Sequence, residues 1–94
     1  MEWQTTFWLD FTIADKFGKA AVQDTFDRAF NEWKDDYIYL TELVIVTNWK
    51  IWQHYEDGDE EMARLYDGLW RKAQGYAYDT LKGDELTYFW RMTD

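Results

Sequence analysis

The side chains in this sequence that could perform chemistry are few in type. The chain contains neither cysteine nor serine, so it lacks the commonest nucleophiles of covalent catalysis and the thiolates that bind structural zinc. Its single base that titrates near neutral pH is His54, beside Tyr55 and Glu56 late in a predicted helix. We expect His54 to be a partly exposed helix-end residue, where the helix dipole favours its cation. We therefore predict a protein that is not an enzyme, with no catalytic, cofactor-binding or metal-binding residues.

Carboxylates are abundant, because 19 of the 94 residues are Asp or Glu. The densest group is Glu56, Asp57, Asp59, Glu60 and Glu61. A calcium loop of EF-hand type beginning at Asp57 would place Met62 where Gly is required and Gly68 where Glu is required, so that motif fails. Capping of the next helix and solvation by water explain the group. A loose cation site, and with it a carboxylate-based metal enzyme, is the weaker alternative.

Aromatic residues make up 21% of the sequence, including seven Trp. A domain of this size is too small to bury all of them, and exposed Trp and Tyr concentrate the binding energy of protein interfaces. Core packing is the default for any single ring. Trp49 and Trp52 flank the apolar stripe of a predicted helix, so they are the first candidates for an interface. The predicted protein-binding residues are Trp49, Trp52, Glu56, Asp57, Asp59, Glu60 and Glu61.

The formal net charge is −9. This charge opposes direct binding to nucleic-acid phosphates and to anionic membranes, and it indicates either a basic protein partner or simply good solubility. Wholesale imitation of DNA needs about 20 charges over 35 Å, more than the chain offers, although mimicry of a local phosphate path stays open. The longest apolar run, 43–46, is far shorter than the ~18 residues of a membrane span, and the N-terminus does not resemble a signal peptide. We expect a cytoplasmic protein.

Helices must position these residues, because the apolar side chains recur with the helical period. The predicted elements are an aromatic arm or one-turn helix over 1–11, a short helix over 12–17 ended by Gly18, helices over 19–34, 37–55 and 60–82, and a last short helix capped by Asp84. The predicted fold is therefore all-α, a single domain over 1–94. It is a compact bundle of three long antiparallel helices with a short helix at each end.

Two features of the long helices leave alternatives open. The β-branched run 44–47 suits a buried strand, but the helical spacing on both sides of it favours a central helix with neighbours on several sides. Gly68 and Gly75 lie seven residues apart within a predicted helix, where each costs about 1 kcal/mol relative to Ala. They indicate either close packing against a bulky ring or a smooth patch that a partner helix approaches.

Three segments carry a resemblance to known proteins: Phe7–Gly18, Asp24–Lys34 and Asn48–Tyr55. Together they resemble small uncharacterised acidic proteins encoded on conjugative elements and phages of gut Firmicutes, over most of the chain. That group has no assigned catalytic or binding residues to carry over. The resemblance implies a context in which short acidic proteins often inhibit host defences, such as restriction or CRISPR nucleases.

The composition and the resemblance lead to one functional hypothesis and one alternative. The hypothesis is a non-enzymatic protein-interaction module, a mobile-element or phage accessory protein of anti-CRISPR or antirestriction type that contacts a larger, basic partner. The alternative is a self-associating structural module, in which the surplus aromatic residues close a homodimer. Neither requires a cofactor.

Overall fold

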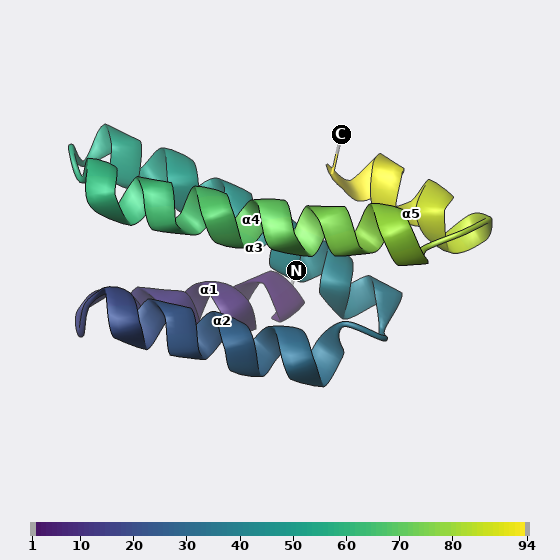
Figure 1. The fold of residues 1–94 in the computed structure, drawn as a ribbon, viewed down its shortest axis with the longest axis horizontal. Helices are drawn as coiled ribbons and strands as arrows, with labels where there is room; N and C mark the ends of the chain where they lie inside the picture. Colours follow the sequence, from purple (N-terminus) through teal and green to yellow (C-terminus); the bar gives the residue numbers. More distant parts are fainter. Residues whose placement is uncertain (1, 94) are drawn as a thin grey trace.

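The computed structural model describes residues 2–93, with side chains described from Phe7 to Thr93. This part of the chain is all-helical and has no strand. Its five helices are α1 (Glu2–Asp15), α2 (Lys19–Trp33), α3 (Tyr37–Glu56), α4 (Glu60–Thr80) and α5 (Asp84–Thr93). Figure 1 shows α1 and α2 side by side in one half of the molecule, with α4 and α5 in the other.

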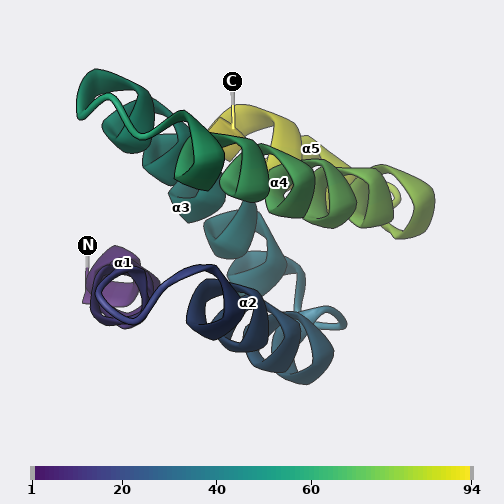
Figure 2. The same cartoon turned by 60° about the vertical axis from the view of Figure 1, so that its left-hand side comes forward.

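Helix α3 connects the two halves. It rises from the α1–α2 side to lie along α4, and it contacts each of the other four helices (Figure 2). Val44, Ile45, Val46 and Thr47 are all buried within it. The Thr47 hydroxyl donates to the carbonyl of Leu43 at 2.8 Å, which satisfies its polar atom inside the helix. The prediction of a central helix over the β-branched run is therefore confirmed.

The bounds of α2, α3 and α4 lie within two residues of those predicted, because local signals set them. Asp36 caps α3, its carboxylate accepting from the backbone N–H groups of Ile38 and Tyr39 at 3.0 and 3.3 Å. Asp59 caps α4 and accepts from Met62 N–H at 3.1 Å. The prediction for Asp84 was wrong in detail, since this residue is the first of α5 rather than its cap.

The N-terminal segment differs most from expectation. A single helix runs from Glu2 to Asp15 in place of an arm followed by a short helix. Phe7, Phe11 and Ala14, at i, i+4 and i+7, face the core. Further apolar residues on the opposite face hid this period from the sequence. The predicted stop at Gly18 is confirmed, with φ 105° and ψ −175°, backbone angles open essentially to Gly alone.

Gly68 and Gly75 are exposed on α4. A Cβ atom added at either position meets nothing within 4 Å. Close packing against a bulky ring is therefore excluded for the part of the chain whose side chains are described. Glycine therefore destabilises α4 at both positions, and no contact with the described residues requires a glycine there.

Candidate protein-interaction surface and buried polar network

Aromatic side chains are exposed along the last turns of α3. Trp49, Trp52 and Tyr55 are 42%, 59% and 46% exposed, and we call them the aromatic ridge. The rings of Trp52 and Tyr55 lie 6.2 Å apart. Trp49 packs edge-on against Trp8 of α1, with ring centroids 6.3 Å apart. This contact holds one ring of the ridge in place while the ridge remains open to solvent.

The predicted acidic residues form the turn between α3 and α4, and all five are exposed. We call Glu56, Asp57, Asp59, Glu60 and Glu61 the acidic turn. The capping expected of this group is provided by Asp59, and Glu61 lies 3.2 Å from Lys19 in an exposed ion pair. Exposed pairs of this kind contribute little to stability, so the turn remains a negatively charged feature of the surface. Among the described residues, no group of three His, Asp or Glu side chains is arranged to hold a metal ion.

The aromatic ridge and the acidic turn adjoin each other. Trp52 and Glu56 are four residues apart on α3, so they lie on the same side of the helix. The acidic turn follows directly after Tyr55. The structure therefore brings the sequence-predicted residues together at one end of α3 and adds Tyr55 to them.

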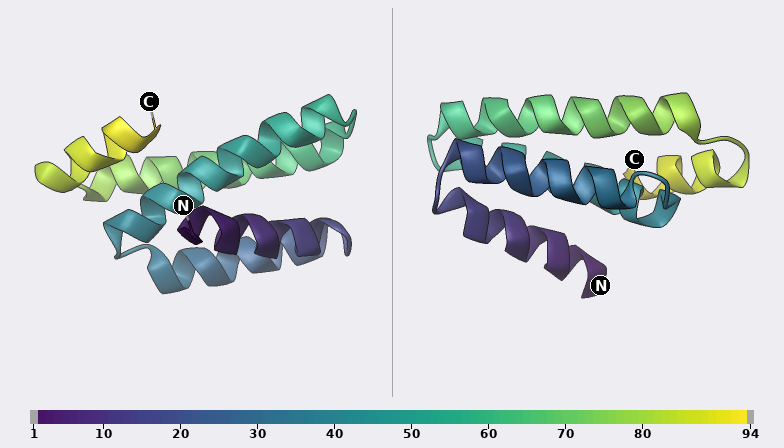
Figure 3. Two further views of the ribbon diagram at one scale, coloured as in Figure 1. Left: turned by 180° about the vertical axis from the view of Figure 1, so that it is seen from behind. Right: turned by 60° about the horizontal axis from the view of Figure 1, so that its bottom comes forward.

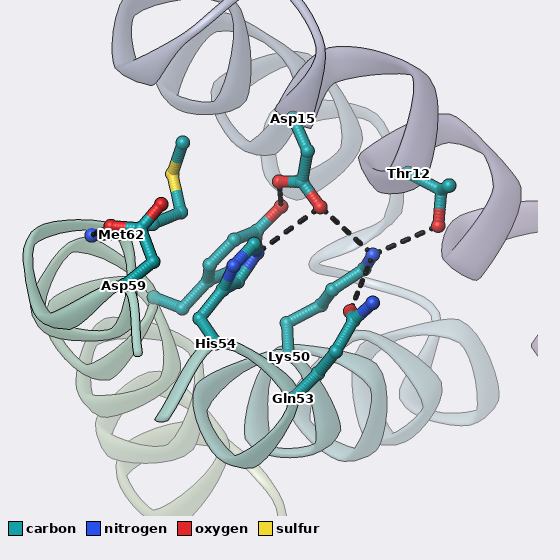
Figure 4. A network of polar contacts seen from close by, with 8 residues as sticks. Thr12, Asp15, Lys50, Gln53, His54, Asp59 and Met62 are labelled. Carbon is teal, nitrogen blue, oxygen red and sulfur yellow. Dashed lines mark hydrogen bonds and ion pairs between the residues drawn. The ribbon is translucent and has the colours of Figure 1, made fainter. Parts of the chain in front are cut away.

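A second polar feature, which sequence reasoning missed, centres on Asp15 at the end of α1 (Figure 4). One carboxylate oxygen accepts a hydrogen bond from the Tyr66 hydroxyl at 2.6 Å. The other accepts from Lys50 Nζ at 2.9 Å and lies 3.1 Å from His54 Nε2. One carboxylate thus joins α1 to both α3 and α4.

Lys50 is completely buried in this network. Its ammonium group donates to Thr12 Oγ1 at 2.8 Å, to Asp15, and to Gln53 Oε1 at 3.0 Å. The same nitrogen lies 4.1 Å from the centre of the Trp8 ring, in cation–π geometry. Three acceptors and one ring face therefore replace the water that a buried cation loses.

The expectation that His54 is a partly exposed helix-end residue was wrong. It is 8% exposed, and its ring stacks on Tyr66 with centroids 5.3 Å apart. His54 follows Lys50 by four residues, so both project from one side of α3 toward Asp15. Two basic residues at this spacing in a largely apolar helix were the available signal, but their partner lies in a distant segment.

The network links α1, α3 and α4 through side-chain contacts, which is a structural role. Burial, the hydrogen bond to Asp15 and the negative charge of Asp15 all raise the pKa of Tyr66 well above its usual range, so Tyr66 remains a neutral donor. An acid–base catalyst must lie within hydrogen-bond reach of its substrate. Because Lys50 and Tyr66 are completely buried, neither can meet a molecule from solution.

Glu42 is a further buried ionisable residue of α3, outside the network, with 1% of its surface exposed. Neither carboxylate oxygen has a hydrogen-bond partner among the described residues. Burial raises the pKa of Glu42 from 4.5 to about 7, because a charged carboxylate would lose its hydration without compensation. Burial raises the pKa of the neighbouring Tyr88 too, and negative charge on Tyr37 or Glu42 raises it further.

Comparisons with protein-family models, with curated proteins and with solved structures found no match for this chain. Over the described residues, none of the helices combines the length and the apolar character needed to cross a bilayer. The candidate surface therefore rests on the geometry of this chain alone.

Proposed function

We propose that this protein is a protein-interaction module whose contact surface is formed by the aromatic ridge and the acidic turn. The observation that carries the proposal is the exposed aromatic ridge, Trp49, Trp52 and Tyr55, which runs along α3 into the exposed acidic turn. Exposed Trp is a costly feature for a soluble surface, and Trp is among the residues that contribute most when an interface forms.

The electrostatics favour a basic partner. The acidic turn adds local negative charge to a chain whose net charge is −9. Complementary charge speeds the encounter of two proteins and selects against partners of the same sign, while the desolvated aromatic rings supply affinity. In this division of roles, the acidic turn steers the partner and the aromatic ridge anchors it.

Nucleic-acid-binding enzymes are a class of partner that this charge fits, because they present basic surfaces to phosphates. We propose inhibition of a host defence nuclease as the finer function, with the acidic turn occupying part of a phosphate path. This step depends on the acidity of the turn and on the context implied by the resemblance to proteins of mobile elements. Nuclease inhibition is thus a more specific proposal than the interaction module, and the module can be correct without it.

The test is a pull-down from a Firmicute lysate with purified protein as bait, at low and moderate salt. Trp52→Ser and the triple variant Asp57→Asn, Glu60→Gln, Glu61→Gln probe the ridge and the turn. Trp90→Ser is the matched control, because Trp90 is 52% exposed but belongs to α5. We expect a salt-sensitive basic partner that Trp90→Ser retains and the other two variants lose. Equal capture by all variants would refute the surface, and a bait that runs as a dimer and captures nothing would favour the homodimer.

A further inference from the structure

The outer face of α1 is apolar and uncovered. Leu9 and Ile13 lie four residues apart on this face, and Phe17 follows in the turn directly after the helix. All three side chains are exposed and form one apolar stripe, in which Phe17, with 79% of its surface exposed, is the most accessible. The opposite face of the same helix packs into the core through Phe7 and Phe11. A helix with apolar residues on two opposite faces normally has neighbours on both sides. Here the second neighbour is absent from the described chain.

A groove of about 520 Å³ lies next to this stripe, between α1 and α2. Its lining runs from Phe17 and Ala21 at the turn between the helices to Phe7 and Trp33 at the far end. Phe7 and Phe17 are 10 residues apart and Ala21 and Trp33 are 12 residues apart, which corresponds to about 15–18 Å or three helical turns. The right-hand view of Figure 3 shows the two helices leaving the turn together and separating toward the N-terminus.

Small side chains keep the groove open. Ala14, Ala21 and Ala29 are part of its lining, so a visiting backbone can come close to both helices. An extended peptide gains its affinity largely from main-chain hydrogen bonds to a sheet edge. Two α-helices offer no such edge, because their backbone groups are already paired. A third helix, whose own backbone is also paired, is the occupant that this groove suits.

The charges along the groove select the kind of helix. Asp10, Asp24 and Glu32 line it, against one cation, Arg28. The Arg28 guanidinium already pairs with Asp24 at 2.9 Å. A second copy of this chain would bring the same carboxylates and a net charge of −9, so self-association through this face is electrostatically disfavoured. A basic helix complements the groove.

We propose that the groove between α1 and α2 binds a basic amphipathic helix of a partner protein. Apolar side chains of that helix at i, i+3 or i+4, and i+7 would cover Ile13 and Phe17, and its Lys or Arg residues would face Asp10, Asp24 and Glu32. This site goes beyond the proposed function, because it lies on α1 and α2 rather than at the end of α3.

The probe is a fluorescent synthetic peptide of about five helical turns, with Leu at helical spacing and Lys elsewhere. Its anisotropy is titrated with the full chain. One control peptide has the same composition in an order that destroys the stripe, and another carries Glu in place of Lys. We expect the striped Lys peptide to bind and both controls to bind at least about tenfold more weakly.

Matched variants locate the site. Phe17→Ser and Ile13→Asp should each weaken the striped peptide about tenfold, because each removes an apolar contact of a large side chain. Asp10→Asn with Glu32→Gln should weaken it about threefold and reduce its salt dependence. Trp90→Ser and Trp52→Ser should leave the affinity unchanged. Phe17 is so exposed that its substitution leaves folding intact, so the test survives if Ile13→Asp is poorly folded.

Three results would overturn the proposal. Equal binding of the striped peptide and of the control peptide with the same composition but no stripe would mean that charge alone drives the interaction. Loss of binding in Trp52→Ser but not in Phe17→Ser would assign the peptide to the aromatic ridge. Concentration-dependent dimerisation that Phe17→Ser abolishes would make a second copy the occupant.

Discussion

Two buried ionisable side chains on α3 lie in opposite environments, one with polar partners and one without. Lys50 and Glu42 lie eight residues apart, and 0% and 1% of their surfaces are exposed. Lys50 has three hydrogen-bond acceptors and a Trp ring around its ammonium group. The Glu42 carboxylate has no hydrogen-bond partner among the residues whose side chains are described.

The difference shows what a small helical fold requires of a buried charge. A cation surrounded by acceptors keeps its charge and adds a specific link between helices. A carboxyl group without partners has its pKa raised to about 7 and is favoured in the neutral form at lower pH. Removal of the charge should therefore destabilise the fold at Lys50 and stabilise it at Glu42.

The largest effect is expected from breaking the network at its shared acceptor. Asp15→Ala leaves Lys50, His54 and Tyr66 buried without their common partner, and should lower the free energy of unfolding by about 3–5 kcal/mol. Urea denaturation measures this loss. The control is Asp67→Ala, which removes an exposed carboxylate paired with Arg71 and should change stability little. Similar losses of unfolding free energy in both variants would mean that the network does not stabilise the fold.

Glu42→Gln should raise the stability at alkaline pH. Below pH 4.5 both folded and unfolded chains hold the Glu42 proton. As pH rises from 4.5 to about 7 the unfolded chain releases that proton while the folded chain retains it, so wild-type stability falls, by about 3 kcal/mol above pH 7. Gln has no proton to release. Urea midpoints measured from pH 4 to 8 should coincide at the acidic end and diverge as pH rises; parallel curves would contradict the expectation.

Lys50→Met reverses the sign of that result. Met fills much of the same space but leaves Thr12 and Gln53 without their donor and Asp15 without its cation. We expect a loss of about 2 kcal/mol at neutral pH, smaller than for Asp15→Ala because Tyr66 and His54 still contact the carboxylate. Thermal melting of both α3 variants in one buffer provides the comparison. A gain in stability from Lys50→Met would show that the ion pair costs more than it contributes.

The smallest effect on stability is expected at two positions where the substituted side chain contacts no neighbour. Gly68→Ala and Gly75→Ala place a methyl group in open space on α4, and each should add about 0.5–1 kcal/mol through helix propensity. Gly58→Ala is the control in the opposite direction, because its φ of 80° is strained for a residue with a side chain. Thermal melting should rank the three variants on either side of wild type. A loss at Gly68 or Gly75 would show that these glycines have a contact that the fold of the single chain does not contain.

Local signals made three of the helices predictable from the sequence. Helices α2 and α4 each have a clear apolar period, and Asp36 and Asp59 cap the starts of α3 and α4. These signals lie within or next to each helix, so they can be read from the sequence. Helix α1 was not predictable as one element, because apolar residues on its outer face remove the contrast between its two sides.

The exposed positions of the candidate surface were predictable because Trp49 and Trp52 lie off the apolar stripe and the acidic turn falls between helices. The network was not, since the partners of Asp15 are 35, 39 and 51 residues away. The burial of His54 depends on that tertiary arrangement, to which no local pattern points.

The long separation between Asp15 and Tyr66 also has a consequence in time. A ribosome adding about 5–20 residues per second needs roughly 3–10 s to pass from one to the other. During that interval α1 and α2 can pair, and Lys50 and His54 emerge before their carboxylate has received its last donor. A nascent chain that stops before α4 carries a half-satisfied polar cluster and an uncovered α3. The network can therefore be completed only after α4 has been synthesised, and Phe89 of α5 joins the core later still.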